Sequence, residues 1–80
     1  MWFVYVLKSE KNGRYHTGST NDLTRRLGEH NSGHSKSTSL TRPFILIYKE
    51  TYSTRLEARR RELFLKTGNG REFLKKTLDG

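Results

Sequence analysis

Two short runs of apolar residues, 2–7 and 44–48, stand out in an otherwise polar chain. The first is β-branched and aromatic, and its apolar side chains occupy both alternating sets of positions, which is typical of a strand buried on both faces. The second run has a similar composition and predicts another strand. Asn12-Gly13 is a strong signal for a tight turn. Residues 14–18 are therefore expected to return as a short strand that closes a hairpin with the first run.

A first helix is predicted directly after this hairpin. Residues 19–22 read Ser-Thr-Asn-Asp, all of which are favourable N-caps, and Leu23 and Leu27 follow one turn apart. The helix is expected to run to about Asn31. The next residues, as far as Pro43, are Ser, Thr, Gly and basic residues with almost nothing apolar. That length and composition are typical of a functional or mobile loop.

Two more helices are predicted after the second strand. Ser53 or Thr54 caps the first of them, which is expected to extend to about Lys66 and to be stopped by Gly68. Asn69-Gly70 then separates this helix from a short last one.

The predicted elements occur in the order strand, strand, helix, strand, helix, helix. This order indicates an α+β fold, an α/β sandwich in which helices flank a three-stranded, mostly antiparallel sheet. Residues 1–80 are too few for two independent cores and are expected to form one domain. The chain has no cysteine, which excludes disulfides and thiolate zinc sites. Its apolar runs are too short for a membrane span, and no signal segment opens the sequence. We therefore expect a cytoplasmic protein without a membrane partner.

The charge of the chain indicates what it binds. Sixteen Lys and Arg against eight Asp and Glu give a formal charge of +8, which favours a polyanionic partner, nucleic acid foremost. The alternatives are a domain kept soluble by its charge, or a basic ribosomal or membrane-surface protein. Half of the basic residues lie between positions 55 and 76. There they form either a phosphate-binding flank or a solvated helix face.

Helical phase marks two side chains of the first helix. At about 100° per residue, Arg26 and His30 lie beside the stripe of Leu23 and Leu27, whereas Arg25 points away. A guanidinium that grips two phosphate oxygens and an imidazole that titrates near neutral pH suggest a phosphate contact. A solvated helix face with an incidental histidine is the alternative.

The second long helix carries a carboxylate in an apolar stripe. Glu62 shares one face with Ala58 and Leu65, while Leu56 and Leu63 mark another apolar face. A desolvated carboxylate must be paired or metal-bound, because leaving it buried alone costs several kcal/mol. Glu62 is therefore either a partner of Lys66 or Arg59, as is common on helices, or a metal-binding or catalytic acid.

Four segments, taken in order, together resemble the GIY-YIG nuclease superfamily. They are residues 3–9, residues 15–31, Arg42-Pro43 and residues 57–62. Phe3-Val4-Tyr5 stands where the first tripeptide of the family name falls, and His16-Thr17-Gly18 stands where the second falls. The resemblance covers nearly the whole chain. It is closest to small stand-alone members, which are similar to the N-terminal nuclease module of the excinuclease C subunit of bacterial nucleotide-excision repair.

This resemblance implies a metal-dependent endonuclease that hydrolyses DNA phosphodiester bonds in DNA repair or recombination and leaves 5′-phosphate and 3′-hydroxyl ends. The implied catalytic residues are Tyr5, His16, Arg26, His30 and Glu62. Glu62 would hold one Mg²⁺ or Mn²⁺, since a single carboxylate suits an ion that keeps much of its hydration. Arg26 would neutralise the non-bridging oxygens. Tyr5, His16 and His30 would orient or deprotonate the attacking water.

We expect five further side chains, Tyr15, Lys36, Arg42, Arg59 and Lys66, to contact the nucleic acid. The expected partner is DNA. RNA stays open, because backbone contacts do not choose between sugars without a group that reads the 2′-hydroxyl. The protein is expected to act as a monomer or a homodimer. A function of another class is a nucleic-acid-binding module that kept the fold and the basic surface but lost catalysis.

The second tyrosine of the family name is replaced by His16. Either the imidazole takes over the role of the phenol, or a one-residue adjustment brings Tyr15 into its place. The first interpretation is favoured because neighbouring residues of a strand face opposite sides. Imidazole has a reference pKa of about 6.5 and phenol of about 10. We therefore expect His16 to be the base or water-orienting group, with Tyr5 as a hydrogen-bonding partner.

Overall fold

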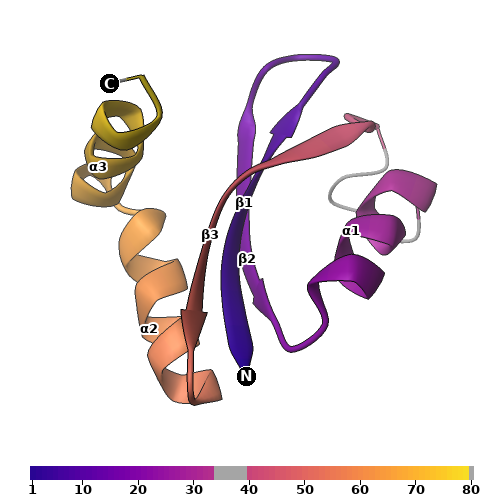
Figure 1. Ribbon diagram of the computed structural model, residues 1–80. Coiled ribbons are helices and arrows are strands. Elements are labelled where there is room, and N and C mark those ends of the chain that lie inside the picture. Colours follow the sequence, from indigo (N-terminus) through magenta and orange to yellow (C-terminus); the bar gives the residue numbers. More distant parts are fainter. Residues whose placement is uncertain (34–39, 80) are drawn as a thin grey trace.

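The structure is a computed structural model that describes residues 1–33 and 40–79. In this part of the chain, three strands form an antiparallel sheet in the order β2-β1-β3, with α1 on one face and α2 and α3 on the other (Figure 1). The elements are β1 (Trp2–Ser9), β2 (Tyr15–Thr20), α1 (Leu23–Ser32), β3 (Phe44–Tyr52), α2 (Arg55–Leu65) and α3 (Gly68–Asp79). The predicted α+β class and the predicted order of elements are confirmed.

The central strand, β1, separates two small cores. On one face Val4 and Val6 pack with Ala58, Leu65 and Leu74 of the two C-terminal helices. On the other face the second core contains Tyr5, Leu7 and Phe44, with Leu23 and Leu27 of α1 packed against them. The four side chains from Val4 to Leu7 are at most 2% exposed, and each buried side chain of this size stabilises the fold by about 1.5–3 kcal/mol. The predicted burial of this strand on both faces is confirmed.

The helix starts follow the predicted caps. The carboxylate of Asp22 accepts a hydrogen bond from the backbone N–H of Arg25 at 3.1 Å. The hydroxyl of Thr54 accepts one from the N–H of Glu57 at 3.2 Å. Gly33 ends α1 with a φ of 84°, a left-handed conformation that favours glycine.

The predicted end of α2 at about Lys66 is confirmed, but the role predicted for Gly68 is wrong. Gly68 does not stop this helix: Lys66 is its C-cap, with right-handed backbone angles, and Gly68 begins α3. Asn69-Gly70, predicted to separate the two helices, lies in the first turn of α3. The reason is packing. A Cβ at Gly70 would lie 2.1 Å from the carbonyl oxygen of Phe64, so the glycine lets α3 start against the end of α2.

An asparagine ties α1 to β3. The side chain of Asn31 donates to the carbonyl of Phe44 at 3.1 Å and accepts from its N–H at 2.6 Å. This pair of bonds fixes the C-terminal turn of α1, including the neighbouring His30, against the sheet. The loop predicted between Asn31 and Pro43 is described only at its ends, because residues 34–39 lie outside the described part of the chain.

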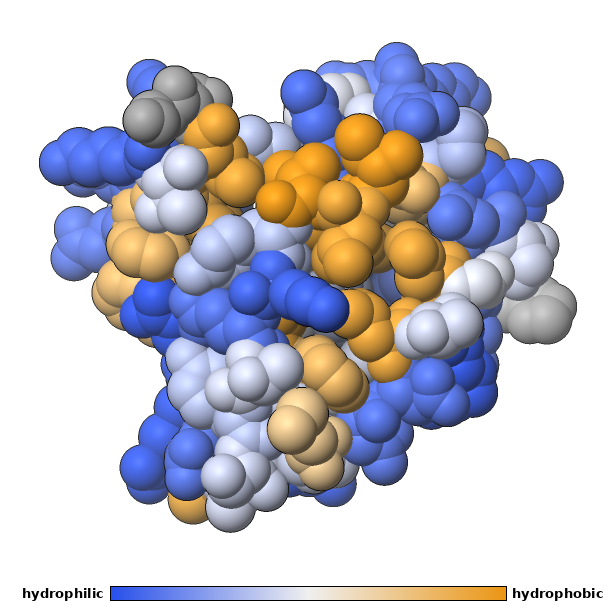
Figure 2. Space-filling view, in the orientation of Figure 1, coloured by the Kyte–Doolittle hydropathy of each residue, from blue (hydrophilic) through white to orange (hydrophobic). Residues whose placement is uncertain are grey.

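Apolar surface gathers over the middle of the face shown in Figure 2. The edge strand β3 contributes two exposed apolar residues, Ile45 and Leu46, which are 44% and 36% exposed. Leu56 and Leu63, the second apolar face marked on α2, are also exposed. No helix of the described residues has the length and apolar character needed to cross a bilayer.

Candidate active site

A groove of about 530 Å³ lies along β2, between α1 and α2. It is lined by residues of four elements: Trp2, Tyr5, His16, Thr17, Gly18, Ser19, Arg26, Arg55, Arg59, Glu62 and Lys66. Four of these side chains are cationic and one, Glu62, is a carboxylate. An excess of positive charge in a concave surface favours a polyanionic ligand.

Side chains alternate between the two faces of the sheet along β2, so residues from both faces contribute to this groove. His16 is paired with Leu7 and Gly18 with Tyr5, so these residues face α1. Ser19 is paired with Val4 on the opposite face, and its hydroxyl reaches Glu62 of α2. Because β2 is an edge strand of the sheet formed by residues 1–33 and 40–79, groups from both faces meet around its free side.

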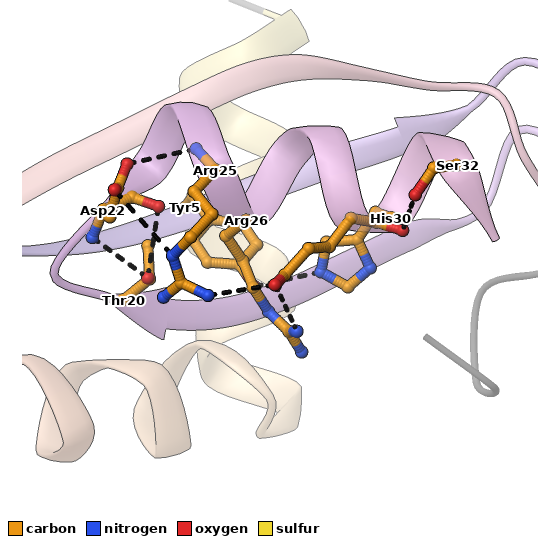
Figure 3. Close-up of polar contacts among 8 residues, drawn as sticks. Tyr5, Thr20, Asp22, Arg25, Arg26, His30 and Ser32 are labelled. Atoms are coloured by element: carbon orange, nitrogen blue, oxygen red, sulfur yellow. Dashed lines mark hydrogen bonds and ion pairs between the residues drawn. The ribbon is translucent and has the colours of Figure 1, made fainter. Parts of the chain in front are cut away.

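Three predicted side chains meet at the wall formed by α1. The Tyr5 hydroxyl lies 3.2 Å from Nε2 of His30 (Figure 3), and the guanidinium of Arg26 lies close enough to the same hydroxyl to oppose the effect of burial on its pKa. Burial raises the pKa of Tyr5, although Arg26 opposes this shift. Gly18 leaves room for the phenol, because a Cβ there would lie 2.5 Å from the hydroxyl oxygen.

The two histidines pack edge to face. The ring centroids of His16 and His30 are 4.8 Å apart, and both rings lie near Phe44. Burial lowers the pKa of both, to about 4 for His30, and Arg26 lowers both further by repulsion. Both imidazoles are therefore neutral at pH 7. His16 lines the groove, whereas His30 is fully buried behind Tyr5.

Glu62 is 4% exposed and accepts three hydrogen bonds. Oε1 accepts from the Ser19 hydroxyl at 2.6 Å. Oε2 accepts from Lys66 at 2.8 Å and from Arg59 at 3.1 Å. Burial alone would raise the pKa of this carboxyl, but the bonds from Lys66 and Ser19 outweigh it and hold the pKa below its usual value. Both ion pairs that the sequence offered for Glu62 are thus present, and the carboxylate is charged at neutral pH.

The structure brings most of the predicted site together. Tyr5, His16, Arg26 and Glu62 line the groove, as do Arg59 and Lys66. Lys36 lies outside the described residues.

Two predicted contact residues do not line the groove. Tyr15 lies beside it, on the α3 side of β2. The guanidinium of Arg42 lies against Gly33 at the C-terminal end of α1, where a cation interacts favourably with the helix dipole.

Two residues of the site, Ser19 and Glu29, were not singled out by the sequence. Ser19 binds Glu62, and Glu29 pairs with Arg26 at 3.2 Å. Glu29 carried a signal, since it lies three residues after Arg26 on the same helix, whereas the contact of Ser19 requires the strand register. Arg55, which belongs to the basic segment between residues 55 and 76, lies 5.7 Å from the Trp2 ring centroid at the rim.

One member of the basic segment between residues 55 and 76 is used elsewhere. Arg61 donates two hydrogen bonds to Glu50 of β3, at 2.9 and 3.2 Å, and its guanidinium lies between the rings of Phe64 and Phe73. The hydroxyls of Tyr48 and Tyr52 also donate to Glu50. Burial and the bond to this carboxylate raise the pKa of Tyr52 to about 12. Arg61 therefore ties α2 to β3 on the far side from the groove and is not part of a phosphate-binding flank.

Comparisons with known proteins agree with this arrangement. The sequence model of one protein family, described as the GIY-YIG catalytic domain, matches residues 1–76. A UPF0213 protein of Staphylococcus epidermidis is 39% identical over 79 residues, which are 98% of this chain and 95% of the relative. One from Staphylococcus aureus is 41% identical over 66 residues, 81% of this chain and 79% of the relative. The solution NMR structure of a UPF0213 protein from Bacillus halodurans, 32% identical, has a TM-score of 0.58 and matches 96% of this chain and 85% of that one.

Proposed function

Since the chain belongs to the GIY-YIG family, we propose that it is an endonuclease that hydrolyses DNA phosphodiester bonds with the help of one Mg²⁺ or Mn²⁺ ion. The observation that carries the proposal is the groove itself. Within it a charged carboxylate, a guanidinium, a neutral imidazole and a phenol face the same space among further cations. The likeness to the nuclease module of the excinuclease C subunit supports a setting in DNA repair or recombination.

The groove fits a hydrated ion with a single protein ligand. A carboxylate has about four acceptor positions, and Glu62 uses one on Oε1 and two on Oε2, which leaves one on Oε1. The described residues contain no group of three or more acidic, histidine or cysteine side chains that could form a complete ligand shell. Mg²⁺ tolerates this, since it keeps several waters and also binds substrate phosphates. When bound by Glu62, such an ion would stabilise negative charge on the phosphate and on the leaving oxygen.

His16 is the group best suited to accept the proton of the attacking water. Its pKa is lowered by burial, with Lys66 and Arg26 adding to the shift, so the imidazole is neutral and can accept a proton at pH 7. The pKa of Tyr5 is raised, so the phenol keeps its proton and acts as a hydrogen-bond donor that orients the water or a phosphate oxygen.

The cations of the groove have two roles: one neutralises charge on the scissile phosphate, and the others bind the flanking phosphates of the substrate. Arg26 lies beside Tyr5 and carries a planar guanidinium that can hold two oxygens of the scissile phosphate. Arg59 and Lys66, now paired with Glu62, are exposed enough to turn towards flanking phosphates when substrate binds. His30, which is buried, acts as a positioning residue: it holds the Tyr5 hydroxyl from behind.

Nicking of supercoiled plasmid tests the proposal. The wild-type protein is expected to nick DNA with Mg²⁺ or Mn²⁺ and to be inactive in EDTA, whereas Glu62→Ala is expected to bind DNA in a gel-shift assay without cutting it. If both proteins shift DNA and neither cuts it under any metal condition, the protein is a nucleic-acid-binding module. The three hydrogen bonds already made to Glu62 are the observation that favours this second function.

A further inference from the structure

A second basic pocket lies outside the groove, between the β1–β2 hairpin and α3. It has a volume of about 590 Å³ and is lined by Lys8, Gly13, Arg14, Tyr15, Arg71 and Lys75, which we call the hairpin subsite. Lys8 and Tyr15 are direct partners across the two strands. Arg71 and Lys75 lie one turn apart on α3, on the side that faces them.

The charges of the hairpin subsite are all of one sign. Four cationic side chains line it and no acidic one does. Among the described residues, none of these four cations is in an ion pair, in contrast to Arg26, Arg59 and Lys66 of the groove. Cations gathered without counter-charges repel one another, and an anionic ligand removes that repulsion.

An aromatic ring lies among these cations. Tyr15 is 45% exposed although it belongs to a strand, and its neighbours are long basic side chains that can reach phosphates. Positive charge beside an exposed aromatic ring is how proteins bind single-stranded nucleic acid, since a base can stack on the ring while cations hold the backbone. In a duplex, neighbouring base pairs cover the faces of each base, so only an unpaired or terminal base can lie on Tyr15.

The hairpin subsite is continuous with the groove. A smaller hollow of about 310 Å³ lies between them and shares His16, Thr17 and Lys66 with the groove and Tyr15 and Arg71 with the hairpin subsite. Tyr15 lies four residues along β2 from Ser19, the partner of Glu62, or roughly 13 Å at about 3.3 Å per residue. One strand of a stacked nucleic acid advances about 3.4 Å per nucleotide, so this separation corresponds to about four nucleotides.

We propose that the hairpin subsite binds an unpaired stretch of the substrate about four nucleotides from the scissile phosphate, with a base stacked on Tyr15 and phosphates held by the cations around it. The substrate is then a nucleic acid with a single-stranded segment beside the cut, rather than a continuous duplex. The inference rests on the proposed function, because the distance is counted from the groove in which cleavage is proposed.

Fluorescence anisotropy in EDTA tests the inference without any cleavage. The probes are labelled single strands of about 12 nucleotides, as DNA and as RNA, and a blunt duplex of the same length. Tyr15→Ala is expected to weaken single-strand binding about tenfold, since the stack is lost, whereas Tyr15→Phe retains it. Lys75→Ala should lower the slope of log K against log salt by about 0.7, the value for one phosphate contact on a single strand. Lys49→Ala, an exposed cation on β3, is the matched control and should change neither.

Equal binding of single strands by Tyr15→Ala and wild type, with both folded by circular dichroism, overturns the inference. The inference is also overturned if Lys49→Ala and Lys75→Ala weaken single-strand binding equally. The effect of Lys75→Ala would then come from the lost positive charge of the protein as a whole and not from a phosphate contact in the hairpin subsite. The DNA and RNA arms show whether the sugar matters to the subsite. A protein that never cuts but shows the Tyr15 dependence refutes only the proposed endonuclease. A protein that cuts without this dependence refutes only the hairpin subsite.

Discussion

Acid is expected to destabilise this protein before its carboxylates are protonated, because His30 is buried. The side chain is 0% exposed, and its pKa is lowered to about 4 by burial, with repulsion from His16 and Arg26 adding to the shift. In the unfolded chain the imidazole binds a proton below about pH 6.5, whereas in the folded protein it stays neutral down to about pH 4. Stability is therefore full above pH 6.5 and is lost as the pH falls towards 4.

The size of the effect follows from proton linkage. With pKa values of 6.5 unfolded and about 4 folded, lowering the pH from 7 to 5 costs about 2 kcal/mol of unfolding free energy. A chain of 80 residues has a total of about 4–12 kcal/mol, so the loss is a large fraction of the whole. His16, whose pKa is also lowered by burial, adds to it in the same direction.

Urea unfolding followed by circular dichroism at pH 7, 6 and 5 measures this loss. His30→Gln is the informative variant, since glutamine occupies the place of the imidazole without titrating. It should be less stable than wild type at pH 7 but should lose about 2 kcal/mol less between pH 7 and pH 5. A loss of less than about 0.5 kcal/mol by wild type over this range, or a loss by His30→Gln as large as that of wild type, would contradict the destabilising role assigned to His30.

Three substitutions test other parts of the structure. Gly18→Ala places a Cβ 2.5 Å from the Tyr5 hydroxyl oxygen, so the phenol must move and nicking should slow at least about tenfold; an unchanged rate contradicts this. His16→Phe keeps the ring packing but not the proton acceptor, so the rate should fall about 100-fold or more. Because burial lowers the pKa of His16, the wild-type rate should fall only at a pH below the ordinary imidazole range, and this fall should disappear in that variant. Arg61→Lys removes the bidentate hydrogen bond to Glu50. This substitution should lower the unfolding free energy, measured by urea denaturation, by about 1–2 kcal/mol.

The elements were predictable because their signals are local. Asp22 and Thr54 bond the helix starts they were expected to cap, and the hairpin forms around Asn12-Gly13. Gly68 was misread because a glycine after a helix suggests a terminator, whereas the glycine that the packing requires is Gly70. That requirement depends on how two helices meet, which local sequence does not contain.

The side chains that line the groove could be predicted where the family resemblance or the helical phase pointed to them. Phase alone singled out Glu62 as an acid in an apolar stripe, and the structure shows both of the ion pairs that the sequence offered as the alternative to a metal-binding or catalytic role. Ser19 was missed because its bond to Glu62 depends on the register of β2 and on the rotation of α2. Arg61 was misplaced for the same reason: the basic run is continuous in sequence, but one member turns to Glu50 on the other side of the helix.

The most direct test of the account is the single-turnover rate of Mg²⁺-dependent DNA cleavage by Glu62→Gln, compared with Glu57→Gln. Both substitutions remove one charge from α2, but Glu57 is exposed in the first turn and Glu62 lines the groove. Glu62→Gln is expected to be at least about 100-fold slower than wild type, while Glu57→Gln stays within about twofold. Cleavage by folded Glu62→Gln at the wild-type rate would contradict this expectation.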